Sequence, residues 1–144
     1  MKAYAMTKYR LSQDYLFFDI KSSMPGCHVP EVIRRDVECM KRYYQENPNV
    51  TAVLCIDFDT MKVCETAANE LGLRIPEDLS LVCFDAPDDG LTYHEYTHIR
   101  QAELEIGERA VRMLLDVIRG DREPKYLLVP TELCIGNSTA SPSR

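Results

Sequence analysis

The stretch Thr51–Pro87 constrains the fold of this chain more than any other part of it. An apolar run, Ala52–Ile56, leads to an acidic residue, Asp57, and a helix-like segment follows. A second apolar run, Leu81–Phe84, again ends at an aspartate, Asp85. This order predicts two parallel strands joined by a helix, with a carboxylate at the carboxyl end of each strand. Because ligands of open α/β sheets bind in the crevice beyond those strand ends, we expect the functional site there.

The rest of the chain continues the alternation of helices and strands. Proline suits the first turn of the helix that begins at Pro30, and Gly72 suits the end of the next one, for which Asp59 or Thr60 is the expected cap. The alternation predicts an α/β fold with a mainly parallel sheet and helices on both faces. The predicted elements are a helix over 1–10, a strand over 14–20, a helix from 30 to the Asn-Pro-Asn stop at 47–49, a strand over 51–56, a helix over 60–71, strands over 80–84 and 96–99, a helix over 103–119 and an extended segment over 126–135.

Length and composition exclude several classes of protein. The 144 residues, 45% of them hydrophobic, are enough for one domain with a core. No apolar run reaches the roughly 20 residues that span a bilayer, and the start lacks a secretory signal, so we expect a cytoplasmic protein without membrane contacts. A net charge of −6 without a basic stripe argues against DNA binding by this chain alone.

The six cysteines contain no C-x-x-C pair. Cys55 and Cys83 lie inside the apolar runs, where a free thiol behaves as a small hydrophobic group. A reduced protein is therefore the simpler interpretation, and an extracellular disulfide framework is the alternative. We predict no cofactor.

Four segments taken together resemble the effector-binding domain of LacI-family transcriptional regulators. They are TAVLCIDFDT from Thr51, ELGLRIPEDLSLVCFDAP from Glu70, THIRQAELEIGERAVRMLLDVIRG from Thr97 and LLVPTELCIGNSTASP from Leu127. The resemblance covers residues 30–144 well and the start weakly. It implies one lobe of a periplasmic-binding-protein-like (type I) fold, in which two α/β lobes close over a small ligand, often a sugar.

The resemblance implies sensing rather than catalysis. A member of this family binds a small polar effector, such as a sugar or a related metabolite, and relays closure to a DNA-binding headpiece, which this chain lacks. We expect residues 1–144 to form a single truncated effector-binding domain, mostly the carboxyl-terminal lobe.

Two surfaces should then seek partners. The helix over 103–119 is expected to pack on the missing lobe in the full-length protein. Without that lobe, its wide apolar arc should fold onto its own lobe or exchange with a second copy, because exposed leucines and isoleucines are costly. We also expect a homodimer. The helix over 60–71 lies where the family commonly dimerises, although its small residues would fit packing on its own sheet equally well.

Four residues are candidate ligand contacts, namely Asp85, Asp57, Gln101 and Phe58. The carboxylate of Asp85 matches a family contact and can accept hydrogen bonds from two adjacent hydroxyls of a sugar or polyol, or else cap the next loop. Asp57 stands where the family has asparagine, which favours a ligand that offers donors, such as an amine. Gln101 matches a family contact position and can donate and accept, or else it forms hydrogen bonds within its loop. Phe58, where the family has aspartate, could stack on a sugar or pack in the core.

Two other functions remain open from the sequence. A secreted solute-binding protein shares the fold, although the missing signal and the closing segment argue against it. The motif His94-Glu95-Tyr96-Thr97-His98 matches H-E-x-x-H, in which two histidines on one helical turn bind zinc. Here an Asp-Asp-Gly turn precedes the motif and Ile99 follows, which favours a loop and a strand. Residues four apart in a strand are separated by roughly 13 Å, so we predict neither a metal site nor an enzyme.

Overall fold

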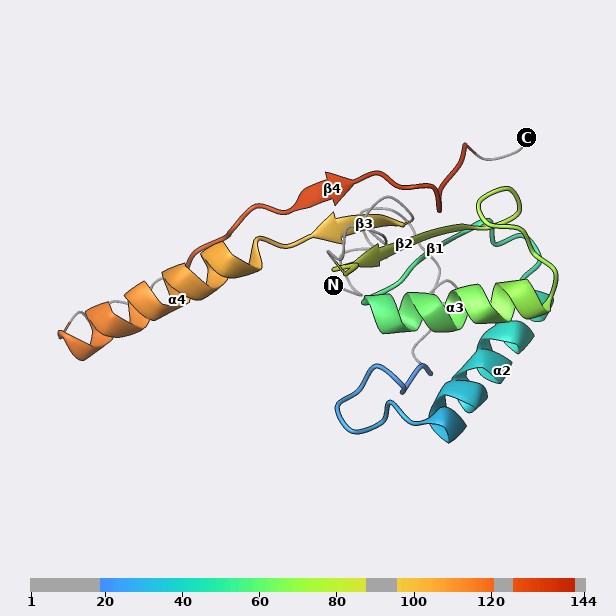
Figure 1. Cartoon of the computed structure of the whole chain (residues 1–144), viewed down its shortest axis with the longest axis horizontal. Coiled ribbons are helices and arrows are strands. Elements are labelled where there is room, and N and C mark those ends of the chain that lie inside the picture. The colour runs from blue at the N-terminus through green and yellow to red at the C-terminus, as the bar shows by residue number, and fades with distance from the viewer. Residues whose placement is uncertain (1–18, 88–95, 121–125, 142–144) are drawn as a thin grey trace.

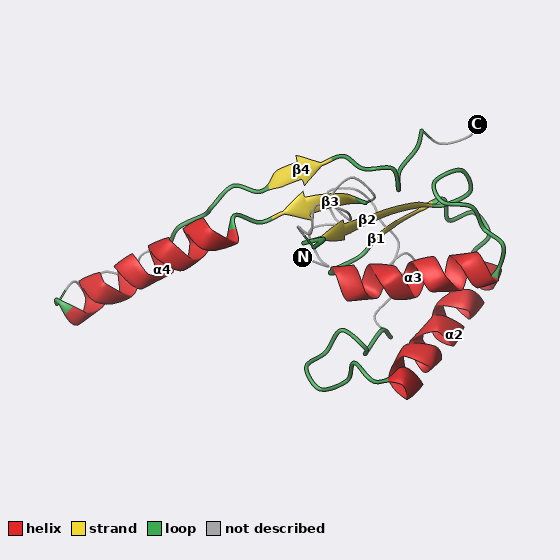
Figure 2. Cartoon of the chain, viewed as in Figure 1, coloured by secondary structure: helices red, strands yellow, loops and turns green. Residues whose placement is uncertain are grey.

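The computed structural model describes residues 19–87, 96–120 and 126–141. The predicted helix over 1–10 and most of the predicted strand over 14–20 lie outside these ranges. The other predicted elements are present with bounds within two residues, except that only the last part of the closing segment pairs as a strand. In chain order the elements are α2 (Pro30–Glu46), β1 (Ala52–Leu54), α3 (Phe58–Glu70), β2 (Ser80–Phe84), β3 (Thr97–Arg100), α4 (Glu103–Ile118) and β4 (Glu132–Cys134) (Figure 1 and Figure 2).

The four strands form one sheet in the order β1-β2-β3-β4. β1 pairs with β2 and β2 pairs with β3 in parallel, whereas β4 runs antiparallel to β3. Leu54 lies opposite Val82, and Phe84 lies opposite Ile99. The carboxyl ends of the three parallel strands therefore meet at one edge of the sheet. The prediction of a mainly parallel sheet is confirmed.

Helix α3 lies against the sheet and supplies much of the core. Ala67 and Ala68 have 0% exposure, and their small side chains allow the helix to approach β2, where Leu81 and Cys83 are also fully buried. The helix ends at Glu70, and Gly72 follows the C-cap residue Leu71 with a φ of 75°, a left-handed conformation that glycine adopts without strain. Of the two interpretations of the small residues on this helix, packing on its own sheet is the one that the structure shows.

Helix α2 packs on α3 through apolar residues at helical spacing, which are Val37, Met40 and Tyr44. Both helices lie on the same side of the sheet (Figure 1). The sequence predicts helices on both faces of the sheet, whereas within the described ranges α2 and α3 cover one face. The physical reason is the path of the chain after β3, because the next helix leaves the sheet instead of returning over it.

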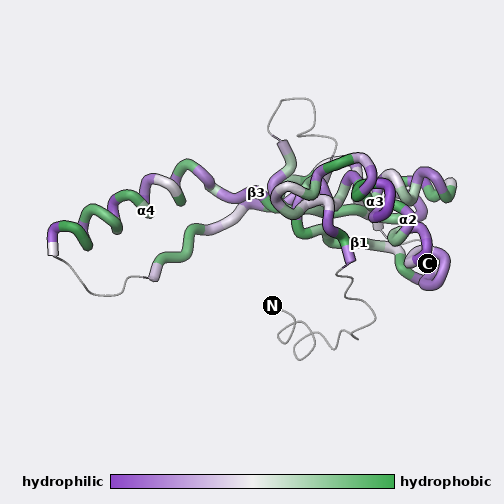
Figure 3. The backbone as a smooth tube through the Cα atoms, turned by 90° about the horizontal axis from the view of Figure 1, so that it is seen from below, coloured by the Kyte–Doolittle hydropathy of each residue, from purple (hydrophilic) through white to green (hydrophobic). Residues whose placement is uncertain are grey.

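Helix α4 extends away from the rest of the described chain (Figure 1). None of its residues is buried, and Leu104, Val111 and Ile118 are 81%, 57% and 71% exposed. Apolar residues recur along its whole length (Figure 3). The expectation that this helix folds onto its own lobe is wrong, since both connections to it run outward from the sheet. None of the described helices is long and apolar enough to cross a membrane.

The segment after β4 is tied into the sheet by a buried serine. The Ser138 hydroxyl donates to the Leu81 carbonyl at 2.6 Å and accepts from the Thr97 backbone N–H at 2.9 Å. Because Ser138 is only 3% exposed, it joins β2 to β3 away from water. Nearby, Gly136 lies against the backbone of Tyr96. A Cβ on Gly136 would lie 2.5 Å from the Tyr96 carbonyl carbon, which is too close for any other residue without a shift.

We predict that Ser138→Ala lowers the free energy of unfolding by about 1–3 kcal/mol, because it leaves a buried N–H without its acceptor. Urea denaturation followed by circular dichroism measures the change. The matched control is Ser141→Ala, an exposed serine, which should change stability by no more than about 0.5 kcal/mol. Equal effects of the two substitutions would contradict this account of Ser138.

Candidate functional site

The predicted crevice edge is formed where β1 and β2 end. Asp57 follows β1 by three residues, and Asp85 follows β2 directly. The segment between β3 and α4 passes the same edge and brings Gln101 to Asp85. Of the four predicted contact residues, the structure therefore joins Asp85 and Gln101 directly.

Asp85 is bonded to β3 and to the segment that follows it through three groups. Its backbone N–H donates to the Ile99 carbonyl at 3.0 Å. One carboxylate oxygen accepts from the Gln101 backbone N–H at 3.1 Å, and the other accepts from the Gln101 side-chain amide. Asp85 adopts a φ of 54°, a left-handed conformation that aspartate tolerates better than most residues. The carboxylate thus bridges to the next segment, in line with the capping alternative, and remains at the crevice edge.

Asp57 is the N-cap of α3. Its Oδ1 accepts from the Thr60 backbone N–H at 2.7 Å, which satisfies one of the unpaired donors at the start of the helix. The prediction of Asp59 or Thr60 as the cap is therefore wrong. The helix begins earlier, at Phe58, so the cap lies two or three residues before the predicted ones. One oxygen of Asp57 is committed to this structural role, whereas its contact with a ligand stays a prediction.

Phe58 packs against the core, which is one of the two alternatives that the sequence leaves open for it. Its ring meets the ring of Tyr96 edge to face, with centroids 5.6 Å apart and an interplanar angle of 74°. Tyr96 is 4% exposed, and its hydroxyl accepts from Lys62 at 3.0 Å and donates to Glu65 at 2.8 Å. Burial raises the pKa of the Tyr96 hydroxyl, while the Lys62 ammonium opposes the shift.

The thiol next to the crevice is protonated at neutral pH. Burial raises the pKa of Cys83 to about 11, and the nearby carboxylates of Asp85 and Asp57 act in the same direction. Since the thiolate is the nucleophile and the metal ligand, this thiol is poorly suited to either role. Cys55 also has a raised pKa, caused first by its hydrogen bond with Cys64 and then by burial.

The zinc motif lies only partly within the described chain. His94 and Glu95 fall outside it, and His98 lies in β3 rather than on a helix, as the sequence predicts. His98 is 1% exposed, and its Nδ1 is 2.9 Å from the Tyr96 carbonyl oxygen, which can only accept, so Nδ1 carries the proton. Among residues 19–87, 96–120 and 126–141, no three His, Cys, Asp or Glu side chains are grouped so as to hold a metal ion.

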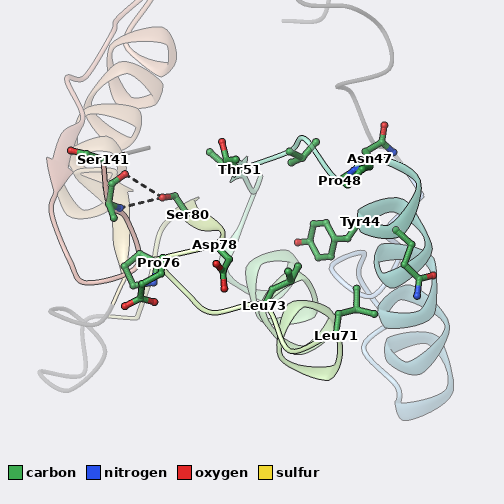
Figure 4. Close-up of a pocket in the computed structure, with 15 residues that line it drawn as sticks. Tyr44, Asn47, Pro48, Thr51, Leu71, Leu73, Pro76, Asp78, Ser80 and Ser141 are labelled. Atoms are coloured by element: carbon green, nitrogen blue, oxygen red, sulfur yellow. Dashed lines mark hydrogen bonds between the residues drawn. The ribbon is translucent and has the colours of Figure 1, made fainter. Parts of the chain in front are cut away.

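Two of the cavities formed by the described residues open on opposite edges of the sheet. The larger, about 700 Å³, lies at the amino ends of β1 and β2 and includes Tyr44, Leu73 and Ser80 in its wall (Figure 4). Several of its polar groups already have partners within the protein. Ser80 bonds to the backbone of Ala140, and Asp78 forms an ion pair with Arg74 that lowers the pKa of Asp78 to about 2.

The smaller cavity, about 400 Å³, lies where the chain leaves for α4 and returns from it. Its wall consists of Arg100, Gln101, Ala102, Pro130, Thr131 and Glu132. We assign the candidate site to this edge despite the smaller volume, because Gln101, which lines this cavity, is bonded to the carboxylate of Asp85. The ion pair between Arg100 and Glu132 was not predicted. Its two residues are 32 positions apart, and only the β3–β4 register makes them neighbours.

A protein-family model matches most of this chain. Residues 22–139 match the model of the periplasmic binding protein-like domain family. The chain is 33% identical over 110 residues to the HTH-type transcriptional repressor PurR of Haemophilus influenzae, covering 72% of this chain and 32% of PurR. The chain therefore spans about a third of the length of this curated relative.

Solved structures give a consistent result. A LacI family transcriptional regulator from Bifidobacterium animalis subsp. lactis superimposes with a TM-score of 0.67 at 27% identity, covering 77% of this chain and 41% of that protein. The transcriptional regulator CelR in complex with cellobiose superimposes with a TM-score of 0.64 at 26% identity, covering 74% and 33%.

We predict that Asp57→Ala lowers the free energy of unfolding by about 1 kcal/mol, within the range of about 0.5–2 kcal/mol for a lost N-cap. Asp57→Ser, which retains a capping oxygen, should lose markedly less. Urea denaturation of both variants measures the difference. If serine destabilises as much as alanine does, the carboxylate stabilises the protein by something other than capping.

Proposed function

Because the chain belongs to the periplasmic binding protein-like domain family, among the effector-binding domains of LacI-family regulators, we propose that it senses a small polar effector. The observation that carries this proposal is the convergence of Asp85 and Gln101 at the carboxyl edge of the sheet. That edge is where open α/β sheets bind ligands.

The chemistry of these groups favours a ligand rich in hydrogen-bond donors. An ionised carboxylate is an acceptor only, so the oxygens of Asp85 can take further hydrogen bonds but give none. The Gln101 amide nitrogen donates to Asp85, which leaves the amide oxygen to face a ligand as an acceptor. Asp57 would add a second carboxylate. Neighbouring hydroxyls of a sugar are matched donors, and the cellobiose complex of CelR, a relative of the same fold, supports this ligand class.

Phe58 has a smaller part in the proposal. Its ring edge already meets Tyr96, so it would border the ligand from beside the core rather than present a fully open face. We include it as a contact at the start of α3, next to Asp57. Its effect on affinity should be weaker than that of Asp85, whose charge-assisted hydrogen bonds are stronger than an apolar contact.

We propose a binding function without catalysis. The nearest thiol, Cys83, is buried and has a raised pKa, and His98 is a buried strand residue bonded to the backbone. The relatives reported above are regulators, which supports the same conclusion. No cofactor or metal is part of the proposal.

We further propose that the effector acts by shifting the arrangement of two lobes. In a longer chain, the exposed apolar face of α4 would be covered by the other lobe, and closure over the ligand would be relayed to a DNA-binding domain. A cytoplasmic homodimer completes this proposal. Ala67 and Ala68 are buried within one chain, so a dimer contact on α3 would use other residues of that helix.

A titration with cellobiose, followed by ¹H–¹⁵N NMR of this chain, tests the binding proposal. We expect shifts of the Asp85 and Gln101 amides. For Asp85→Asn we expect an affinity lower by about ten- to a hundredfold, because a hydrogen bond to a charged group is worth about 1.5–3 kcal/mol. Asparagine tolerates the left-handed backbone at this position. The matched control is Asp59→Asn, a change to an exposed aspartate.

Glucose and ribose serve as further probes in the same titration. Shifts confined to the cavity of Figure 4, or an unchanged affinity in Asp85→Asn, would contradict the assignment of the site. No response to any of the three sugars would contradict the proposed ligand class.

A further inference from the structure

The attachment of α4 to the sheet depends on very few contacts. The chain leaves through Arg100–Ala102 and returns through Pro130–Glu132, and these two segments lie against the same small cavity. No residue of α4 is buried. Within the described residues, the direction of α4 is therefore set by the short segments that join it to the sheet (Figure 1).

At the departure point, Asp85 holds the chain from the side. Gln101 lies two residues before the first residue of α4, and both its backbone N–H and its side-chain amide donate to the Asp85 carboxylate. The N-cap residue, Ala102, has no side-chain cap of its own. We call the pair of hydrogen bonds between Asp85 and Gln101 the clasp.

The return segment pairs with β3 through the backbone as far as Arg100 and Glu132, where the β3–β4 ladder ends. The Arg100–Glu132 ion pair joins the two segments, but the side chains are 41% and 63% exposed. Exposed ion pairs are screened by water and salt and stabilise weakly. The clasp is also the contact nearest to α4 itself. A change at the clasp should therefore turn the helix more than a change at the ion pair does.

We propose that the clasp sets the direction of α4 and that an effector bound at Asp85 alters this direction by taking over the hydrogen bonds of its carboxylate. The second part rests on the proposed function, because it needs a donor-rich ligand at Asp85. A carboxylate that accepts from ligand hydroxyls binds the Gln101 donors less strongly, so the two interactions are coupled. Because coupling between two equilibria is reciprocal, the protein binds the ligand more tightly when α4 points in the direction that weakens the clasp.

This coupling gives α4 a role as a lever. The carboxylate that would contact the ligand is hydrogen-bonded to the residue from which the helix departs, so no longer pathway through the core is required. If α4 packs on another lobe, as proposed above, the direction of α4 determines how the two lobes are arranged. Gln101 is then a positioning residue in addition to a predicted ligand contact.

Distance measurements between two spin labels test the clasp without any ligand. The labels are attached to p-acetylphenylalanine at the exposed positions Arg42 on α2 and Arg112 on α4, which spares the native cysteines. Doubly labelled protein is diluted into unlabelled protein so that only distances within one chain are recorded. Urea midpoints and circular dichroism confirm that each variant is folded.

We expect a narrow distance distribution in the parent chain. Gln101→Leu, which removes the side-chain donor, should broaden or shift it. Asp85→Gly, which removes the acceptor but fits the φ of 54°, should change it further. Glu132→Gln is the control and should resemble the parent, because it removes the ion pair and leaves the clasp intact. Distributions that are the same in all four proteins would overturn the clasp.

Cellobiose added to the labelled parent chain tests the coupling. A shift of the distribution towards that of Asp85→Gly supports it. Binding seen by NMR at Asp85 without any change in distance would overturn the coupling. If cellobiose does not bind, the proposed ligand is at fault, and the ligand-free variants still decide whether the clasp orients α4.

Discussion

The packing of α3 against the parallel strands is the constraint on which the rest of this structure depends. The helix places Met61, Ala67 and Ala68 against a sheet whose Leu81 is equally buried, all at about 0% exposure. The small side chains of Ala67 and Ala68 let the helix lie close to the strands, and burial of larger apolar groups such as Met61 stabilises the arrangement. Because α2 then packs on α3 rather than on the sheet, the order of the layers follows from this one contact.

The same contact determines where the polar groups of the site lie. Parallel pairing brings the ends of β1 and β2 to one edge, and the start of α3 at Phe58 makes Asp57 the cap. Asp85 caps none of the described helices, and its carboxylate bonds to the segment that departs for α4. Two aspartates that follow neighbouring parallel strands therefore have different partners, one within its own βα unit and one in the next segment.

Helix α4 is the part of the structure that the core does not hold. Its apolar residues are exposed in the described chain, where it joins the sheet through the segments next to Gln101 and Glu132. A helix attached in this way can transmit a change at its base over its whole length, because helices are stiff and each residue adds about 1.5 Å. This is the physical reason why a single carboxylate at the base can matter for the arrangement of larger parts.

The sequence by itself determined the alternation of elements, the mainly parallel sheet, the position of the candidate edge and the family, because hydrophobic periodicity, turn residues and local motifs are all encoded within short windows. It also indicated a strand at His98 rather than a zinc-binding helix. Only the tertiary structure decided that Asp57 caps α3, that Asp85 bonds to Gln101, that Ser138 joins β2 to β3 and that α4 leaves the body. The bonds of Asp85 and Ser138 depend on the register between distant segments. The cap depends on the residue at which α3 begins, and the path of α4 on where the chain turns after β3, which no local pattern specifies.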